Sequence, residues 1–328
     1  MARTADRITS VGGGKGGVGK SVMAANLAVA MAQEGYRVVL VDADLGAANL
    51  HTMFGLSAQG PSIQSFIERE VDSLEQARVA TQMPGLCLVR GTGAVVGAAN
   101  INHQQKQRLL RHVACLDAEV IIVDVGAGTA YNQLDLFDVA DLRVVVLTPQ
   151  LTSIQNAYAF VKGAVYRALS AVLKLHGRED LLTQAGPDVE TTTLASLINR
   201  AGLPPAALGE IAAFLKAFGA RLLGNQVFDS NEARMFTAMG RMLRDFLGIT
   251  APVLGFARAS RAIHDSINRR QPFMLDAAGE ESANAIRLAA RQLLDEDVLA
   301  IRANRDRAIE SRSPPVIAPI AAFERAAA

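Results

Sequence analysis

Short apolar runs alternate with longer amphipathic segments along the chain, an order typical of a layered α/β protein. Predicted strands occupy residues 7–11, 37–44, 86–91, 119–125 and 142–148, with later strands near 220 and 251. Predicted helices occupy residues 21–35 and about 62–83. The runs at 119–125 and 142–148 are almost entirely apolar, which is typical of central strands covered on both faces. The pattern predicts a doubly wound, mostly parallel sheet flanked by helices.

The second half of the chain contains more residues than a simple crossover needs. About 50 residues separate the helix that starts near Thr152 from the strand at Arg221, whereas crossovers are usually much shorter. We therefore expect a helical insertion at about 172–218. The domain prediction is one α/β domain over residues 1–300, followed by a flexible tail rich in Ala and Pro at 301–328.

Composition limits the compartment and the partners. The chain has 328 residues, of which 33 are basic and 32 acidic, so no overall field attracts it to nucleic acid or anionic lipid. The N-terminus lacks the apolar run of a signal peptide, and no stretch of about 18 apolar residues predicts a spanning helix. A cytoplasmic protein is expected. Cys87 and Cys115 lie too far apart for a C-x-x-C pair.

A glycine-rich segment between the first strand and the first helix carries the strongest chemical signal. Residues Gly14 to Ser21 spell G-x-x-x-x-G-K-S, in which backbone N–H groups and a helix N-terminus cradle phosphates. Lys20 is predicted to reach the β- and γ-phosphates, and the Ser21 hydroxyl to coordinate Mg²⁺. The predicted nucleotide contacts are Gly14, Lys15, Gly16, Gly17, Val18, Gly19, Lys20, Ser21 and Val22. A merely flexible glycine turn would not require the Lys-Ser ending.

Three carboxylates follow apolar strands. Asp42 and Asp44 end one strand and Asp124 ends another, and ligands of parallel sheets gather at the carboxyl ends of strands. A single Asp at a strand end is often only a helix cap. Together they predict a site facing the phosphate loop, with Asp124 binding Mg²⁺ through water or holding Ser21.

The string K-G-G-x-G-K-S, which begins at Lys15, resembles the deviant Walker A motif of the ParA/MinD class of ATPases. That resemblance implies an ATP-dependent dimer in which Lys15 contacts nucleotide across the interface. The segment 41–56 is similar to the switch I region of the MinD and FlhG branches. It implies that Asp44 orients the attacking water and that Asp42 sits beside the metal, so that the catalytic set is Lys15, Lys20 and Asp44 and the metal set is Ser21, Asp42 and Asp124.

Other segments are most similar to the FlhG branch, also called FleN, of flagellar number regulators. They are D-x-G-A-G at Asp124 to Gly128, the stretch at 148–169, FLGITAPVLGF and RRQPF. The resemblance spans about 7–170 and 219–295 and implies that Asn225 reads adenine. Arg258 and Ser260 stand where that family usually has Pro and Asp, which leaves the base side of the site undetermined.

The resulting prediction is an ATPase that binds ATP and Mg²⁺, dimerises with ATP and hydrolyses it slowly as a spatial switch, with a protein partner that stimulates hydrolysis. The alternatives are a ParA-like partitioning ATPase for DNA or cargo and a scaffold that binds ATP without hydrolysing it. The cluster Arg258, Arg261, Arg269 and Arg270 has two interpretations, a contact with DNA or acidic lipid and, more commonly, a solvated helix face. Peripheral binding at the inner membrane face therefore stays open. Iron–sulfur carriers of this class require more cysteines, and its tyrosine kinases require a Tyr-rich tail.

Overall fold

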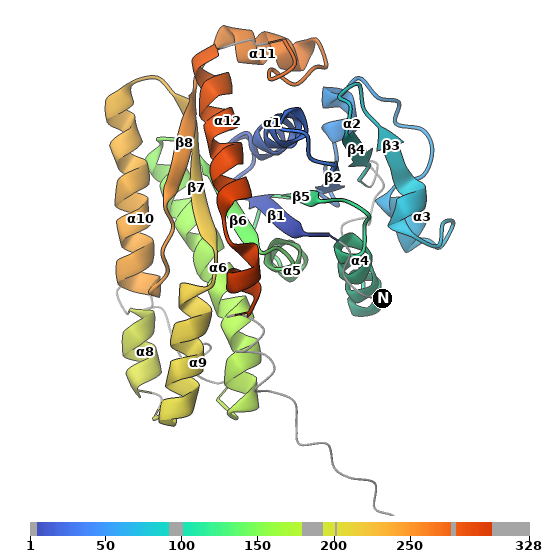
Figure 1. The fold of residues 1–328 in the computed structure, drawn as a ribbon. Coiled ribbons are helices and arrows are strands. Elements are labelled where there is room, and N and C mark those ends of the chain that lie inside the picture. The colour runs from blue at the N-terminus through green and yellow to red at the C-terminus, as the bar shows by residue number, and fades with distance from the viewer. Residues whose placement is uncertain (1–4, 92–100, 179–192, 201, 277–279, 304–328) are drawn as a thin grey trace, which may run out of the picture.

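A mostly parallel sheet forms the centre of the computed structural model, which describes residues 5–91, 101–178, 193–200, 202–276 and 280–303 (Figure 1). In these ranges its eight strands are arranged in the order β3-β4-β2-β5-β1-β6-β7-β8. The strands are β1 (Arg7–Gly12), β2 (Val38–Ala43), β3 (Arg78–Ala80), β4 (Leu86–Val89), β5 (Val120–Val125), β6 (Leu142–Leu147), β7 (Ala220–Val227) and β8 (Val253–Arg258). Only the β3–β4 pair is antiparallel, so the predicted fold class is confirmed.

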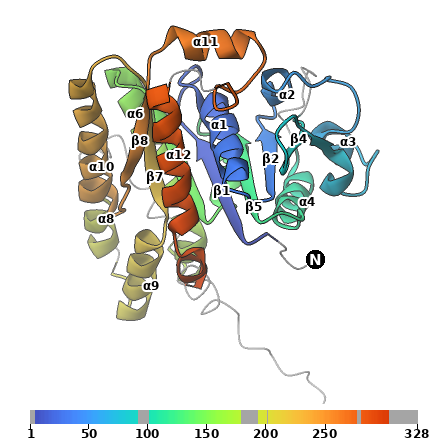
Figure 2. The ribbon, with the colours of Figure 1, turned by 45° about the horizontal axis from the view of Figure 1, so that its top comes forward.

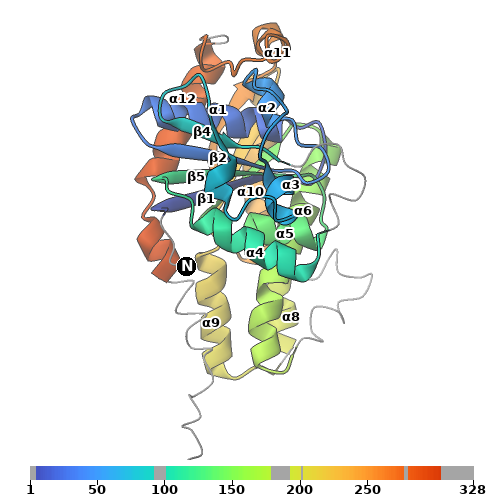
Figure 3. The same cartoon turned by 90° about the vertical axis from the view of Figure 1, so that its right-hand side faces the viewer.

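Helices cover both faces of the sheet. The α-helices are α1 (Lys20–Gln33), α2 (Leu50–Met53), α3 (Ile63–Ile67), α4 (His103–Ala114), α5 (Tyr131–Asp138), α6 (Leu151–Leu175), α8 (Leu194–Arg200), α9 (Pro205–Lys216), α10 (Arg234–Leu247), α11 (Arg261–Asn268) and α12 (Glu280–Asp295). Two short 3₁₀ helices are η1 (Leu74–Ala77) and η3 (Ser230–Ala233). Figure 2 shows α1 and α12 in front of one face, and Figure 3 shows α4, α5 and α6 on the other.

The alternation of side chains along the central strands divides the apolar core into two layers. Ile121 and Val123 of β5 pack with the layer that includes α4, α5, α6 and α10. Val120 and Ile122 pack with α1, α2 and α12 on the opposite face. Since both faces are covered, the central strands are apolar throughout, as their sequence predicts.

The segment at about 62–83 differs from its prediction. Its helices are short, and Arg78–Ala80 is an antiparallel edge strand paired with β4. A strand of three residues at a half-exposed edge has too few apolar positions to show a period of two.

The region predicted as an insertion contains the C-terminal end of α6, together with α8 and α9. Figures 1 and 3 show α8 and α9 beside the C-terminal half of α6, away from the main body of the sheet. The predicted tail at 301–328 lies outside the described residues except for its first three positions. No helix in the described ranges is both long and apolar enough to cross a membrane.

Candidate functional site

The phosphate loop joins the C-terminus of β1 to the N-terminus of α1. Gly17 and Gly19 have φ angles of 79° and 92°, a left-handed conformation that side chains other than glycine rarely adopt. A Cβ added at Gly16 or Gly17 would meet no atom within 4 Å. The loop is therefore open on the side where a phosphate would approach its backbone.

Gly14 has a different reason to be glycine. A Cβ at this position would lie 1.9 Å from the carbonyl oxygen of Asn156 in α6. The N-terminal part of α6 thus packs directly against the loop backbone, and no side chain fits between them. Gly14 therefore allows α6 to pack against the phosphate loop and support it.

Lys20, the first residue of α1, is a buried ammonium group that faces two carboxylates. Its side chain is 7% exposed, and its Nζ donates to the carbonyl oxygen of Lys15 at 3.2 Å. Burial lowers the pKa of Lys20, while the charges of Asp124 and Asp44 act to raise it. A triphosphate would offer this cation the anionic acceptors that the surrounding protein only partly supplies.

Asp42 and Asp124 are neighbours at the ends of β2 and β5, where their Cα atoms are in register. Both are 1% exposed. Asp42 Oδ2 accepts a hydrogen bond from the backbone N–H of Leu50 at 3.0 Å, but Asp42 Oδ1 and both carboxylate oxygens of Asp124 are buried without a hydrogen-bond partner. Unpaired buried oxygens are costly, so this cluster is suited to a cation.

The electrostatics agree with a cation site. Burial raises the pKa of Asp42 to about 7, although the Leu50 hydrogen bond opposes this shift. Burial, followed by the Asp42 charge, raises the pKa of Asp124 well above its usual range. Ser21 and Lys20 oppose that shift, but Ser21 satisfies neither carboxylate oxygen with a well-formed hydrogen bond.

The donor set fits Mg²⁺ with phosphate and water as additional ligands. Within the described ranges, no three carboxylate, histidine or cysteine side chains are arranged to hold a metal by themselves. Mg²⁺ usually keeps several waters and is held by one or two protein oxygens together with substrate phosphates. Ser21, Asp42 and Asp124 are the residues that would hold it here, directly or through water.

This cluster predicts that Mg²⁺ binding depends on pH. Because the folded-state pKa of Asp42 is raised to about 7, the metal must displace a proton below that pH. We expect Mg²⁺ to support nucleotide binding more weakly at pH 6 than at pH 8, by up to about tenfold per pH unit for each proton released. In the metal-free protein, the same shift lowers the free energy of unfolding as pH rises from about 4 to about 7. Calorimetric titration of Mg²⁺ and ADP at several pH values measures the binding effect.

The control is Asp42→Asn, which keeps the size of the side chain but has no proton to lose. Its Mg²⁺ dependence should retain only the pH slope contributed by the nucleotide and the other carboxylates. An Asp42→Asn slope equal to that of the unaltered chain would show that Asp42 is not the titrating group.

Asp44 lies at the edge of the cavity, over the turn that follows β5. Its Oδ1 accepts hydrogen bonds from the backbone N–H groups of Gly46 at 3.2 Å and Ala47 at 3.1 Å. A Cβ added at Gly126 would lie 2.9 Å from the same oxygen. Glycine at 126 therefore allows the carboxylate to sit against the turn at 126–130, called the switch turn below, where the carboxylate is half-buried and still reaches the cavity.

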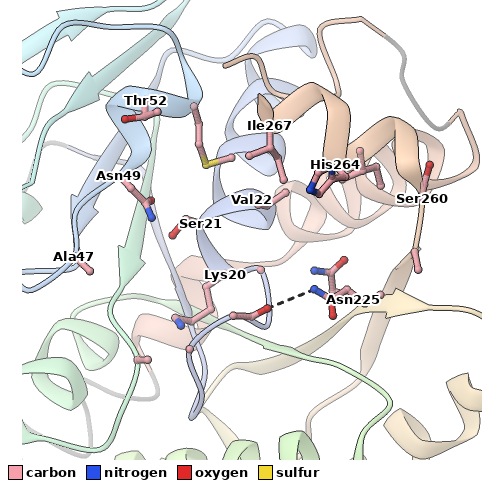
Figure 4. A pocket seen from close by; sticks show the side chains of 18 of the residues that line it. Lys20, Ser21, Val22, Ala47, Asn49, Thr52, Asn225, Ser260, His264 and Ile267 are labelled. Atoms are coloured by element: carbon pink, nitrogen blue, oxygen red, sulfur yellow. Dashed lines mark hydrogen bonds between the residues drawn. The ribbon is translucent and has the colours of Figure 1, made fainter. Parts of the chain in front are cut away.

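The phosphate loop, Asp44 and residues of α2, β7, β8 and α11 surround a cavity of about 810 Å³ at the carboxyl edge of the sheet. Figure 4 shows Lys20 and Ser21 between Ala47, Asn49 and Thr52 on one side and Ser260, His264 and Ile267 on the other. The lining comprises Gly16, Gly17, Gly19, Lys20, Ser21, Val22, Asp44, Ala47, Asn49, Thr52, Met53, Ala127, Asn225, Gln226, Phe228, Arg258, Ala259, Ser260, Ile263, His264 and Ile267. Its size suits a nucleotide-sized ligand.

Most of the residues predicted to bind nucleotide line this cavity, but three of them do not. Gly14, Lys15 and Val18 are absent from the lining: Gly14 packs on α6, Lys15 is exposed and Val18 is buried. Their contact with nucleotide stays a prediction. Asp42 and Asp124 lie behind the lining, as residues that act through a metal would.

Asn225, the predicted adenine contact, is attached to the phosphate loop. Its Nδ2 donates to the carbonyl oxygen of Val18 at 2.9 Å, and a Cβ on Gly19 would lie 2.2 Å from the same nitrogen (Figure 4). The amide therefore joins β7 to the loop. Asn225 also lines the cavity, and an amide can both donate to and accept from a base, so the adenine role stays a prediction.

The base side of the cavity contains residues that carry no recognisable motif. Ile263, His264 and Ile267 come from α11, and Met53 comes from α2. Phe228 lines the rim with 77% of its surface exposed. No periodic pattern or fixed spacing in the sequence marks these residues, which come together only through the packing of α2, β7, β8 and α11.

Arg258 and Ser260 hold the loops of this side together. The guanidinium of Arg258 pairs with Glu281 at 2.7 Å and donates to Ser230 Oγ at 3.1 Å. Ser260 caps α11 by accepting from the backbone N–H of Ala262. An ion pair and a helix cap therefore fix the loops on this side of the cavity.

The chain belongs to the ParA family of P-loop NTPases. The model of that family, described as "NUBPL iron-transfer P-loop NTPase", matches residues 4–170. This membership confirms the resemblance to the ParA/MinD class and agrees with the expectation of an ATPase.

Among curated proteins, the chain is similar to the flagellum site-determining protein YlxH of Helicobacter pylori. The two are 31% identical over 158 residues, which is 48% of this chain and 53% of that protein. The antiactivator FleN of Pseudomonas aeruginosa is 30% identical over 158 residues, 48% of this chain and 55% of FleN. The chain thus matches about half of the length of these relatives.

Solved structures show the same fold over nearly the whole chain. The cell division ATPase MinD of Pyrococcus furiosus superposes with a TM-score of 0.60 at 18% identity, covering 88% of this chain and 98% of that one. A ParA family ATPase from Chlorobium tepidum superposes with a TM-score of 0.58 at 18% identity, covering 88% and 99%. At such low identity these likenesses establish the fold alone.

Proposed function

We propose that this chain binds Mg-ATP in the cavity, pairs with a second copy when ATP is bound, and hydrolyses ATP slowly as a switch for spatial positioning. One observation carries the proposal: a buried lysine ammonium and two carboxylates with unpaired oxygens converge beside an open glycine loop. An anionic polyphosphate with its magnesium ion would satisfy all of these groups together.

Nucleotide binding is supported by the donor set and by a neighbour of the same fold. The septum site-determining protein MinD of Pyrococcus horikoshii was solved in complex with Mg-ADP, and it superposes with a TM-score of 0.60 at 18% identity. In this chain Lys20 would bind the β- and γ-phosphates, and Ser21, Asp42 and Asp124 would hold Mg²⁺. Asp44 would orient the attacking water.

Pairing of two copies is supported by what lies exposed at the carboxyl edge of the sheet. Lys15 is exposed in the phosphate loop. Tyr131 at the start of α5 and Leu151 at the start of α6 are 68% and 67% exposed. Large apolar side chains at a charged rim are typical of a surface that is covered in another state. A second copy would bury them and bring its own Lys15 to the nucleotide.

A positioning role is supported by the relatives. YlxH determines a flagellum site by its name, and FleN is named as an antiactivator. We propose an output of this kind, delivered through a protein partner that recognises the ATP-bound pair and stimulates hydrolysis. Ordering of the segments around Asp44 and Gly126 by the γ-phosphate would present that shape.

The competing functions gain less from the structure. Two of the four arginines of the basic cluster are closely paired, Arg258 with Glu281 and Arg269 with Asp276, which weakens the cluster as a DNA surface. Iron transfer appears in the description of the family model, and an iron–sulfur carrier of Aquifex aeolicus is 33% identical over 48% of this chain. However, Cys87 lies in β4 and Cys115 at the end of α4, on different elements.

The test measures mass and phosphate release with ATP, ADP and no nucleotide. We expect a shift from monomer to dimer with a non-hydrolysable ATP analogue only, together with slow phosphate release from ATP. Lys15→Ala should abolish the shift while monomeric ATP binding persists, because its ammonium would act across the interface. Lys216→Ala, at an exposed position of α9, should behave as the unaltered chain. A dimer that forms without nucleotide, or one that forms equally well after Lys15→Ala, would contradict the switch.

A further inference from the structure

Three helices on one face of the sheet are joined by a single carboxylate. Asp135 of α5 forms an ion pair with Lys106 of α4, with 2.5 Å between Asp135 Oδ2 and Lys106 Nζ. The same carboxylate accepts two hydrogen bonds from Arg167 of α6, at 2.8 Å from Nε and 3.2 Å from Nη2. Figures 1 and 3 show α5 between α4 and α6. The carboxylate therefore holds α5 from both sides.

The two cations do not play equal roles in this cluster. Lys106 is 5% exposed, so its charge depends on Asp135 for compensation. Arg167 is partly exposed, and its guanidinium also lies 4.8 Å from the ring centre of Tyr131, the first residue of α5. Burial acts to raise the pKa of Asp135, but hydrogen bonds from Arg167 and Lys106 outweigh it and lower the pKa. Asp135 is thus a firmly ionised anchor.

The face of α6 that carries Arg167 also contacts both parts of the nucleotide site. Asn156 touches the phosphate loop at Gly14. Seven residues later, Gly163 lies against α5 and the turn before it. A Cβ added at Gly163 would be 3.5 Å from Leu134 and 4.0 Å from Thr129. Arg167 follows after four more residues. Spacings of seven and four place all three on one side of a helix. One side of α6 thus serves as a common wall for the phosphate loop and for α5.

The position of α5 matters because the switch turn leads directly into it. The turn contains Gly126, which lies under the Asp44 carboxylate, and Gly128, whose φ is 103°. Glycine restricts the backbone less than other residues, so the two ends of the turn contribute to its place together with the Asp44 carboxylate. β5 fixes one end, and the Asp135 contacts fix the other.

We propose that Asp135 is a positioning residue for ATP turnover, which places the switch turn against the phosphate loop by holding α5 to α6 through Arg167. This role rests on the proposed ATPase function. Lys106 supplies charge balance and packing on the α4 side, whereas the Arg167 contact transmits position.

The experiment separates position from stability with three variants. Asp135→Ala leaves the Lys106 ammonium buried without a partner, and its melting temperature should fall by on the order of ten degrees. The double variant Lys106→Met with Asp135→Leu removes both charges and should recover most of that loss, since apolar replacements of a buried ion pair are well tolerated. Lys106→Met alone keeps the contact between Asp135 and Arg167, which makes it the matched control.

Single-turnover phosphate release and ATP affinity are then measured for each variant. In the double variant we expect ATP affinity within about threefold of the unaltered chain and turnover lowered by about tenfold or more, because a small misplacement of reacting groups costs that much. Lys106→Met should turn over at nearly the unaltered rate. A merely structural role would restore turnover together with stability.

Two results would overturn this assignment. One is full turnover in the double variant, and the other is an equal loss in Lys106→Met, which retains the Arg167 contact. In both cases the unaltered chain hydrolyses ATP, so the proposed function would survive. An unaltered chain that binds ATP but releases no phosphate would refute the ATPase proposal, and the role of Asp135 with it.

Discussion

Replacement of Lys20 by alanine is expected to lower the rate of ATP hydrolysis by about 100- to 1000-fold and to weaken ATP binding. The estimate follows from the loss of one preorganised donor to developing phosphate charge. In this chain the ammonium is already buried, is acted on by the charges of Asp124 and Asp44, and makes one hydrogen bond, to Lys15, among the described residues. A bound triphosphate would therefore meet this ammonium with little reorganisation of the protein. Phosphate release and calorimetric ATP titration measure the two effects.

The matched control for this change is Lys216→Ala, which removes an exposed lysine of α9 far along the chain from the phosphate loop. It should leave turnover and affinity unchanged. Lys20→Arg adds a second comparison, because it keeps the charge but enlarges the head group in a closed space, so turnover should not recover. If the Lys20→Ala variant hydrolysed ATP within about threefold of the rate of the unaltered chain, the proposed phosphate-binding role of Lys20 would be wrong.

The phosphate loop and the strand-end carboxylates could be predicted from sequence because each is a local feature. The loop is one continuous segment, and Asp42, Asp44 and Asp124 each end an apolar run that is easily recognised. The parallel order of the strands then brings these ends to one edge. Beyond this parallel strand order, no long-range packing had to be known to place Lys20 near Asp124.

The base side and the Asp135 cluster could not be predicted in this way. Residues of α11 reach the cavity only because β8 ends beside β7, more than 200 positions after the phosphate loop. In the sequence, Asp135 cannot be distinguished from the acidic residues of a solvated helix face. Its contacts with Lys106 and Arg167 form only when α4, α5 and α6 pack together. Contacts between distant elements leave no periodic pattern and no fixed spacing.

Two glycines of the phosphate loop are local in sequence but are required by contacts with distant elements. The motif requires Gly14 and Gly19, yet the reasons differ: Gly14 admits the backbone of α6, and Gly19 admits the amide of Asn225. In both cases a distant element approaches the loop backbone closely. The two glycines of the motif are therefore needed for tertiary packing as well as for phosphate binding. Through these contacts α6 and β7 become parts of the site.

Gly126→Ala is expected to lower turnover by about 10- to 100-fold while ATP affinity stays within about threefold. The new Cβ would lie 2.9 Å from Asp44 Oδ1, closer than such atoms approach, so the carboxylate must shift. A shift would weaken its hydrogen bonds from Gly46 and Ala47 and move it from the position proposed for orienting the attacking water. Phosphate release under single-turnover conditions measures the loss.

The double variant Gly126→Ala with Asp44→Ala decides whether the effect acts through Asp44. If the methyl group acts only by displacing that carboxylate, it should cost nothing further once Asp44 is already alanine, because coupled residues are not additive. Independent losses that multiply would instead show that Gly126 is needed for the switch turn itself. Gly209→Ala, where a Cβ would meet no atom within 4 Å, controls for the substitution and should leave turnover unchanged. The outcome therefore distinguishes two roles for Gly126: leaving room for a carboxylate that orients water, and giving the switch turn a backbone conformation that alanine disturbs.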